Sequence, residues 1–181
     1  MSGSGETILP ARLTAADLAT RIDRDVDEVC SVLGARGEPN SPEDLLAGGL
    51  AMVVAQALGV TVSVEARDLA LEHLYELETK GEITSEVEGR AGGIVEGVVS
   101  KLDELDDMIE SVSERWTVAR MPVIDRNILR IAVHELISEP QTPTPVVVSE
   151  AVRLATTYST EKSATFVNGV LATLAKTTRK S

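Results

Sequence analysis

The sequence predicts an all-α protein in which a small three-helix module precedes a larger helical domain. Apolar residues recur at helical spacing along most of the chain, and residues that commonly cap helices precede several of these stretches. Aromatic residues make up only 2% of the 181 residues, so the core must be built from Leu, Val, Ile and Ala. With 43% hydrophobic and 25% charged residues, the composition is that of an ordinary soluble globular protein.

Two capping signals open the first third of the chain. They follow a Gly- and Ser-rich start over residues 1–12, which we expect to be disordered. Thr14 and Asp25 are each followed three residues later by an acidic residue, a pattern typical of a helix N-terminus. Apolar residues at helical spacing come next in both cases. We therefore expect two short helices at the beginning of a module that covers residues 13–64.

A third helix is expected from Ser41 to Leu58, because Pro42 would occupy a first-turn position where its missing N–H costs nothing. Valines alternate with polar residues over 60–64, which predicts a short strand or extended tail. The arrangement, with Leu-Ala in the first helix and Leu-Gly-Val ending the third, resembles the small N-terminal domain of bacterial translation initiation factor 2. That resemblance implies a protein- or ribosome-contact module, and a helical spacer without a binding role is the alternative.

The residues with reactive side chains argue against an enzyme. The single cysteine, Cys30, excludes an intramolecular disulfide and a CxxC zinc site, and the two histidines, His73 and His134, are too few for a histidine-rich metal centre. Cys30 lies in a helical apolar pattern, which favours a buried inert thiol over a nucleophile. We find no phosphate-binding loop and no catalytic constellation, and we expect no cofactor. The sequence also lacks a signal peptide or a long apolar run, so we expect a cytoplasmic protein.

The larger domain is expected over residues 65–181, with five helices. Their predicted positions are residues 66–80, a long amphipathic helix over 94–112, a central helix over 126–137 capped by Asp125, a helix starting at Thr144-Pro145, and a terminal helix capped by Ser163. Gly169 lies inside the terminal helix, where glycine costs roughly 1 kcal/mol against alanine. We therefore expect Gly169 to contact another backbone closely.

Three segments of this domain carry a family resemblance. WTVARMPVIDRNILRIAVHEL begins at Trp116 and is followed by PTPVVVSEAVRLA and SATFVNGVL. This succession resembles the C-terminal half of NusB transcription antitermination factors, and the likeness covers about residues 66–176. It implies an all-helical domain of two small bundles. It also implies a function without catalysis, the binding of boxA-type RNA in nascent ribosomal transcripts together with the ribosomal protein NusE.

The resemblance transfers candidate RNA contacts to the first and last helices of the domain. The matching positions are Arg67, Tyr75, Lys162, Phe166 and Asn168. Arg67 and Lys162 would bind phosphates, while Tyr75 or Phe166 could stack on an unpaired base. Core packing is the alternative for the two aromatic residues, and a bond to a neighbouring loop is the alternative for Asn168. Asp125, at the start of the central helix, is the candidate for the NusE-facing side.

The distribution of charge leaves two functions open. The net charge is −12, yet residues 120–181 contain 8 basic and 5 acidic residues, a net +3. TVSVE also precedes the first helix where the family tends to carry arginines, and lost phosphate contacts weaken RNA binding. These features favour a NusB-like interaction scaffold, including a homodimer, that has lost RNA binding. The close motif match favours an RNA-binding antitermination factor, which is the hypothesis we adopt.

Overall fold

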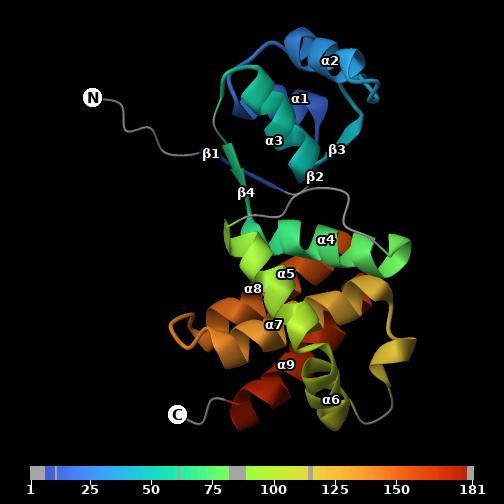
Figure 1. The fold of residues 1–181 in the computed structure, drawn as a ribbon, viewed down its shortest axis with the longest axis vertical. Helices are drawn as coiled ribbons and strands as arrows, with labels where there is room; N and C mark the ends of the chain where they lie inside the picture. The colour runs from blue at the N-terminus through green and yellow to red at the C-terminus, as the bar shows by residue number, and fades with distance from the viewer. Residues whose placement is uncertain (1–6, 11, 61, 82–88, 114–115, 179–181) are drawn as a thin grey trace. The chain divides into compact units, whose positions relative to one another are not determined.

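The computed structural model describes residues 7–10, 12–60, 62–81, 89–113 and 116–178 (Figure 1). The chain divides into two compact units, Met1–Leu69 and Ala70–Ser181. Helices dominate both, and the described strands are only three residues long. The all-α prediction is thus confirmed. No helix in the described ranges is long and apolar enough to cross a membrane.

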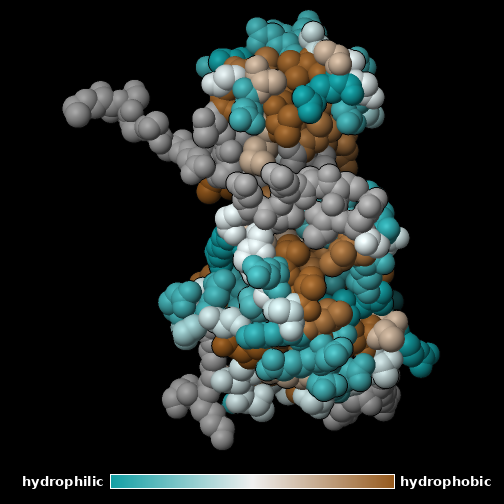
Figure 2. All heavy atoms as spheres, viewed as in Figure 1, coloured by the Kyte–Doolittle hydropathy of each residue, from teal (hydrophilic) through white to brown (hydrophobic). Residues whose placement is uncertain are grey.

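The N-terminal unit combines three helices with short paired strands. Its described elements are β1 (Thr7–Leu9), β2 (Arg12–Thr14), α1 (Ala15–Arg21), α2 (Val26–Ala35), β3 (Leu45–Ala47), α3 (Gly48–Ala57) and β4 (Val62–Val64). β1 pairs with β4 in parallel, and β2 pairs with β3 in antiparallel fashion. The helices enclose an aliphatic core that includes Leu9, Leu18, Val29, Leu33 and Val54. In Figure 2 the apolar side chains of this unit gather over α1 and α3.

The capping predictions for α1 and α2 are confirmed. The Thr14 hydroxyl accepts from the Asp17 N–H at 3.0 Å, and the Asp17 carboxylate accepts from the Thr14 N–H at 3.2 Å. The Asp25 carboxylate accepts from the N–H of Asp27 at 2.8 Å. Cys30 on α2 packs partly buried against the core, and burial raises the pKa of its thiol, which disfavours the nucleophilic thiolate.

The predicted start of the third helix is wrong, because α3 begins at Gly48 rather than at Ser41. Residues 41–44 form a turn in which the Ser41 N–H donates to the Asp44 carboxylate at 2.7 Å. The next three residues, β3, are extended because they pair with β2, which places Leu46 in the core. Local capping signals could not reveal this pairing, since its partner lies some thirty residues earlier in the chain.

The expectation of a disordered start over residues 1–12 is wrong for β1. Thr7–Leu9 is a strand because it pairs with β4, and the pairing places Leu9 in the core of the unit. A three-residue strand offers too few positions for an alternating pattern to be recognised. Residues 1–6 and 11 of the predicted segment lie outside the described residues.

The C-terminal unit is organised around one buried helix. Its elements are α4 (Ala66–Lys80, whose first residues belong to the N-terminal unit), α5 (Gly89–Ser100), α6 (Leu102–Val112), the 3-10 turn η1 (Val118–Arg120), α7 (Val123–Ser138), α8 (Thr144–Tyr158) and α9 (Glu161–Thr178). α7 packs against α5, α6, α8 and α9 and is buried along most of its length. Its central position, predicted from its wide apolar face, is confirmed.

The predicted long helix over 94–112 is wrong, because the chain turns at Lys101 and forms α5 and α6 instead. Lys101 has φ −122° and ψ 22°, outside the helical range, and its ammonium donates to the Ser138 hydroxyl on α7 at 3.2 Å. Apolar residues are buried on both sides of the turn. The apolar stripe therefore continues from α5 into α6 although the two are separate helices, and both helices pack on α7.

The start of α7 also differs from the prediction. The helix begins at Val123 with Pro122 at the N-cap, so Asp125 lies in the first helical turn instead of capping it. Asp125 is only 3% exposed, and its Oδ1 atom has no hydrogen-bond partner. A side chain expected to satisfy backbone N–H groups is thus itself unsatisfied.

The predicted cap of the terminal helix is wrong by three residues. α9 begins at Glu161, and the Thr160 hydroxyl accepts from the N–H of Ser163 at 3.1 Å. Thr160 is therefore the capping residue, and Ser163 lies buried in the first turn. The predicted core stripe of α9 is confirmed, since Val167, Val170, Leu171 and Leu174 are buried.

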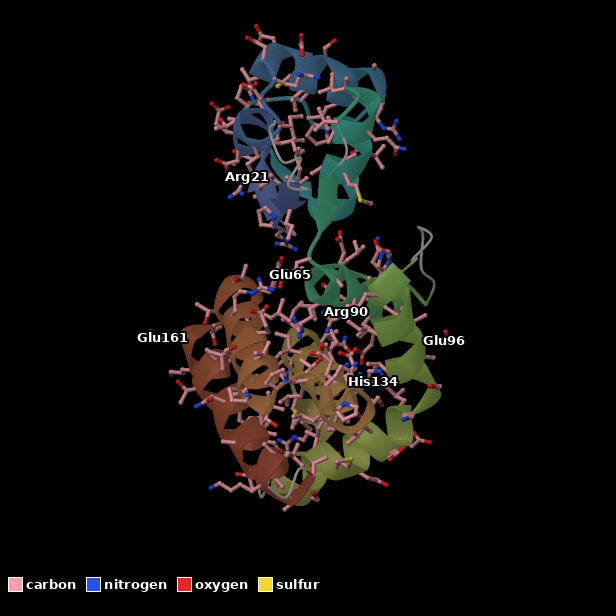
Figure 3. All side chains as sticks on the ribbon, turned by 90° about the vertical axis from the view of Figure 1, so that its left-hand side faces the viewer. Arg21, Glu65, Arg90, Glu96, His134 and Glu161 are labelled. Atoms are coloured by element: carbon pink, nitrogen blue, oxygen red, sulfur yellow. The ribbon has the colours of Figure 1, made fainter. Side chains whose placement is uncertain are left out.

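Another helix closely approaches Gly97, whereas none of the described helices approaches Gly169 in this way. A Cβ added at Gly169 would have no other atom within 4 Å, so the predicted backbone contact is wrong. At Gly97 on α5, an added Cβ would overlap the imidazole of His134 on α7. Figure 3 shows His134 in the interior of the unit. Gly97 is the position where the absence of a side chain lets α5 and α7 pack.

Candidate nucleic-acid interface

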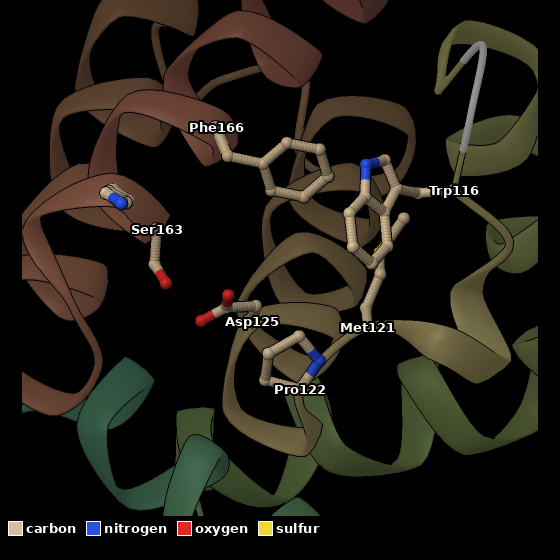
Figure 4. A pocket seen from close by; sticks show the side chains of 7 residues that line it. Trp116, Met121, Pro122, Asp125, Ser163 and Phe166 are labelled. Carbon is tan, nitrogen blue, oxygen red and sulfur yellow. The ribbon is translucent and has the colours of Figure 1, made fainter.

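A pocket of about 260 Å³ opens in the C-terminal unit near the first turns of α7 and α9 (Figure 4). Its lining residues are Trp116, Met121, Pro122, Asp125, Lys162, Ser163 and Phe166. A second hollow of about 360 Å³ shares Trp116 and Phe166 and continues along α9 to Gly169 and Val170. Lys162, Phe166 and Asp125, which the sequence analysis assigned to two different partners, therefore line the same pocket.

Two aromatic side chains form one side of this pocket. In Figure 4 the rings of Phe166 on α9 and Trp116, in the segment before η1, lie next to each other at the pocket. Trp116 is 52% exposed, which is unusual for the largest apolar side chain, and Phe166 is half-buried. Core packing alone does not account for such exposure. Both rings offer surface on which a flat group can stack.

Two oxygen-bearing side chains, Asp125 and Ser163, line the pocket. In Figure 4 the carboxylate of Asp125 and the hydroxyl of Ser163 point toward each other. The Ser163 hydroxyl already lies 3.0 Å from the Ser159 hydroxyl and 2.9 Å from that of Thr160. Asp125 has no such partners, although the N-terminus of α7 favours its negative charge. A buried carboxylate oxygen without a donor costs free energy, so a ligand that supplies an N–H or O–H would be stabilised here.

Lys162 supplies positive charge at the edge of this pocket. It is exposed on the first turn of α9, next to the buried Ser163. Asn168 lies on the exposed side of the same helix and does not line either hollow. The structure thus brings two of the five predicted RNA contacts, Lys162 and Phe166, into one site.

The two residues predicted on the first helix of the domain do not line the pocket. Arg67 on α4 is only 6% exposed and takes part in interactions within the protein, which leaves little of its guanidinium surface for a phosphate. Tyr75 on the same helix is 41% exposed, so its ring is not a core side chain. Exposure is compatible with stacking at Tyr75, although Tyr75 lines neither of the two hollows described above.

Most arginines of the described C-terminal unit are used internally. Arg130 forms two hydrogen bonds of 2.8 Å to the Asp106 carboxylate, Arg126 pairs with Glu78, and Arg90 pairs with Glu135 at 2.8 Å. Such pairs hold α4, α5 and α6 to α7 and neutralise the cations they use. Within the described part of this unit, the exposed basic residues without an ion pair are Arg120, Lys162 and Lys176.

Trp116 is the aromatic residue of the pocket that the sequence analysis did not propose as a contact. A signal was present, since Trp116 is the only tryptophan of the chain and stands outside the apolar stripes of the predicted helices. The sequence did not predict that Trp116 and Phe166 are neighbours, because Phe166 is fifty positions later in the chain. Only the packing of α9 on α6 and α7 brings the two segments together.

Comparison with known proteins identifies one family. The NusB family model matches residues 55–176. The transcription antitermination protein NusB of Leifsonia xyli subsp. xyli is 41% identical over 125 residues, which cover 67% of this chain and 87% of that protein. The structure of T. maritima NusB matches with a TM-score of 0.56 and 31% identity, covering 61% of this chain and 88% of that one. A structure of antitermination factors NusB and NusE in complex with double-stranded RNA matches with a TM-score of 0.51 and 30% identity, over 62% and 94% of the two chains.

Proposed function

The chain belongs to the NusB family, and from this premise we propose that it is a transcription antitermination factor that binds boxA-type RNA together with NusE during ribosomal RNA transcription. A relative that carries the antitermination name, and a related structure that contains NusE and RNA, support this function. We infer that the protein acts by binding and not by catalysis, and that it acts in the cytoplasm.

The observation that carries the proposal is the pocket at the first turns of α7 and α9. Lys162 can contact a phosphate while Trp116 and Phe166 receive an unpaired base. Stacking of one base on an aromatic side chain contributes about 1–3 kcal/mol to binding. Tyr75 and Asn168 are proposed as further RNA contacts outside the pocket, and Arg67 as a residue that orders the start of α4.

The charge of the unit explains why a protein partner is part of the proposal. Few of its described cations are exposed without an ion pair, so phosphate contacts can supply only a modest share of the affinity. We therefore propose that the chain alone binds RNA weakly and that NusE adds the contacts that make binding tight.

A titration tests this function. The full chain is titrated with boxA-type RNA and a scrambled RNA, with and without NusE, at about 50 and about 200 mM salt. We expect specific binding that NusE strengthens. Lys162→Glu should weaken binding and reduce the steepness of its salt dependence by about one phosphate contact. Lys176→Glu, at the other end of α9, is the matched control and should have a smaller effect.

A second function is favoured by the internal use of arginines. If the exposed cations do not suffice for RNA, the chain is a NusB-like scaffold that works through protein contacts, including contacts with a second copy. Recovery of NusE in a pull-down without RNA, combined with no RNA binding under any condition of the titration, would favour this function. RNA binding that depends on Lys162 would exclude it.

For the N-terminal unit we propose a role as a contact module for a protein or a ribosome. Ile8 and Leu45 expose more than half of their side chains, and they lie on strands that a partner could approach. Exposed large apolar side chains are frequent at sites of protein contact.

A further inference from the structure

We propose that the pocket beside Trp116 and Phe166 is a recognition site for one unpaired guanine base, and that the Asp125 carboxylate accepts hydrogen bonds from the Watson–Crick edge of that base. The inference rests on the proposed function, because the guanine is part of the bound RNA. It goes further by giving Trp116 and Asp125 roles and by naming the base.

The size of the pocket suits a single flat group. Its volume of about 260 Å³ lies just below the range of about 300–1,000 Å³ found for sites that enclose drug-sized ligands. The rings of Trp116 and Phe166 border the pocket on one side (Figure 4). Asp125 lines the same pocket, so a base that stacks on these rings can direct its edge toward this residue.

The chemistry of Asp125 selects among the bases. An ionised carboxylate accepts hydrogen bonds and donates none. Guanine presents two adjacent donors on its Watson–Crick edge, N1–H and N2–H, with no acceptor between them, so that either can donate to the carboxylate. Adenine and cytosine present an acceptor nitrogen beside their amino group, and uracil presents carbonyls on both sides of its single N–H. These acceptors would be repelled by the carboxylate, so guanine is the only base of the four that fits without repulsion.

The burial of Asp125 favours a base over a protein surface as the occupant. Asp125 lines the pocket although the residue is only 3% exposed, and its Oδ1 atom has no donor in the described structure. Phosphate is excluded as its partner because two anions would meet. Lys162 at the rim is instead placed for the phosphate of the same nucleotide. The NusE-facing role that the sequence analysis gave to Asp125 becomes the competing outcome of the test.

The first experiment replaces each guanosine of a boxA-type RNA in turn by inosine, which lacks the N2 amino group. Affinity for the full chain with NusE is then measured. At one position we expect binding to weaken by about tenfold or more, since a hydrogen bond to a charged acceptor is lost. Inosine at the other positions should have little effect.

Substitutions in the protein link that position to the pocket. Asp125→Asn keeps the size of the side chain but places a donor in the pocket, and it should reduce the discrimination between guanosine and inosine to less than about threefold. Asp107→Asn, on the exposed face of α6, is the control and should leave the discrimination unchanged. Trp116→Leu should weaken binding of the wild-type RNA, and Trp116→Phe should restore most of it.

The outcomes separate this inference from the proposed function. Specific RNA binding without any sensitivity to inosine, or with equal sensitivity in the Asp125→Asn variant, would overturn the guanine pocket and leave the antitermination function intact. A loss of NusE affinity in the Asp125→Asn variant with unchanged base discrimination would assign the pocket to NusE and overturn the inference. Absence of RNA binding under every condition would overturn both.

Discussion

Replacing Gly97 by alanine should destabilise the C-terminal unit, although alanine is the better helix former. The added Cβ would overlap the Cε1 and Nε2 atoms of His134 and lie 3.0 Å from its Nδ1. His134 belongs to α7 and is only 8% exposed, so its ring has little room to move away from α5. The strain must be relieved by separating α5 from α7 or by forcing the ring into another rotamer.

The magnitude follows from two opposing contributions. Overpacking of a core costs about 1–3 kcal/mol, and overlap with several ring atoms places Gly97→Ala near the upper end of that range. The helix propensity of alanine returns about 1 kcal/mol. We expect a net loss of about 2 kcal/mol. Gly169→Ala is the matched control, since its Cβ meets nothing within 4 Å, and it should gain about 1 kcal/mol.

The assay is urea denaturation followed by tryptophan fluorescence. Trp116 is the only tryptophan of the chain and lies in the C-terminal unit, so the signal reports on that unit alone. In a His134→Ala background, Gly97→Ala should lower the free energy of unfolding much less than it does in the wild type, because the imidazole that it would overlap is absent. Such coupling would exceed about 0.5 kcal/mol, because the two residues are in contact.

One result would refute this reasoning. If Gly97→Ala were as stable as the wild type, or stabilised like Gly169→Ala, the imidazole would not be confined as the structure indicates. A loss of stability that persisted unchanged in the double variant would show that the cost does not come from His134.

Two further predictions concern the buried polar groups. Arg130→Lys should lower the stability of the C-terminal unit by about 1–3 kcal/mol in the same urea assay, because lysine cannot reproduce the two 2.8 Å bonds to Asp106; an unchanged midpoint would argue against that pair. Burial lowers the pKa of His73 and of His134 below that of an exposed histidine. At mildly acidic pH, the unfolded chain therefore protonates these imidazoles more readily than the folded protein does. Stability is therefore fully present above about pH 6.5 and should fall below it, by at most about 1.4 kcal/mol per pH unit for each histidine. Urea midpoints that stay constant between about pH 7.5 and pH 5.5 would contradict this.

Local signals in the sequence were sufficient for the helices whose ends depend on local contacts. The capping box of Thr14 and Asp17 is closed by two bonds three residues apart, so pattern and structure agree. The break at Lys101 was not predictable in this way. The apolar stripe runs through it without interruption, and the bond that accompanies the turn reaches Ser138 on another helix.

The candidate site shows the same limit. Phe166 was found in the SATFVNG motif and Lys162 directly before it, because both lie near the start of one helix. The contribution of Trp116 depends on packing between α9 and the segment before η1, which no spacing within one segment encodes. Asp125 was recognised as an acid near a helix start, but a one-turn error in that start hid the fact that its carboxylate is buried without a donor.

The parallel pairing of β1 with β4 has a mechanical consequence for the N-terminal unit. Because the pairing is parallel, the Thr7 end of β1 and the Val64 end of β4 lie at opposite ends of the strand pair. Tension between these two points would pull the paired strands in opposite directions along their axes. The backbone hydrogen bonds of the pair would then be loaded together in shear and not broken one after another. If transcript, ribosome or polymerase pulled on this chain, the N-terminal unit would resist extension at the strand pair that joins its first and last elements.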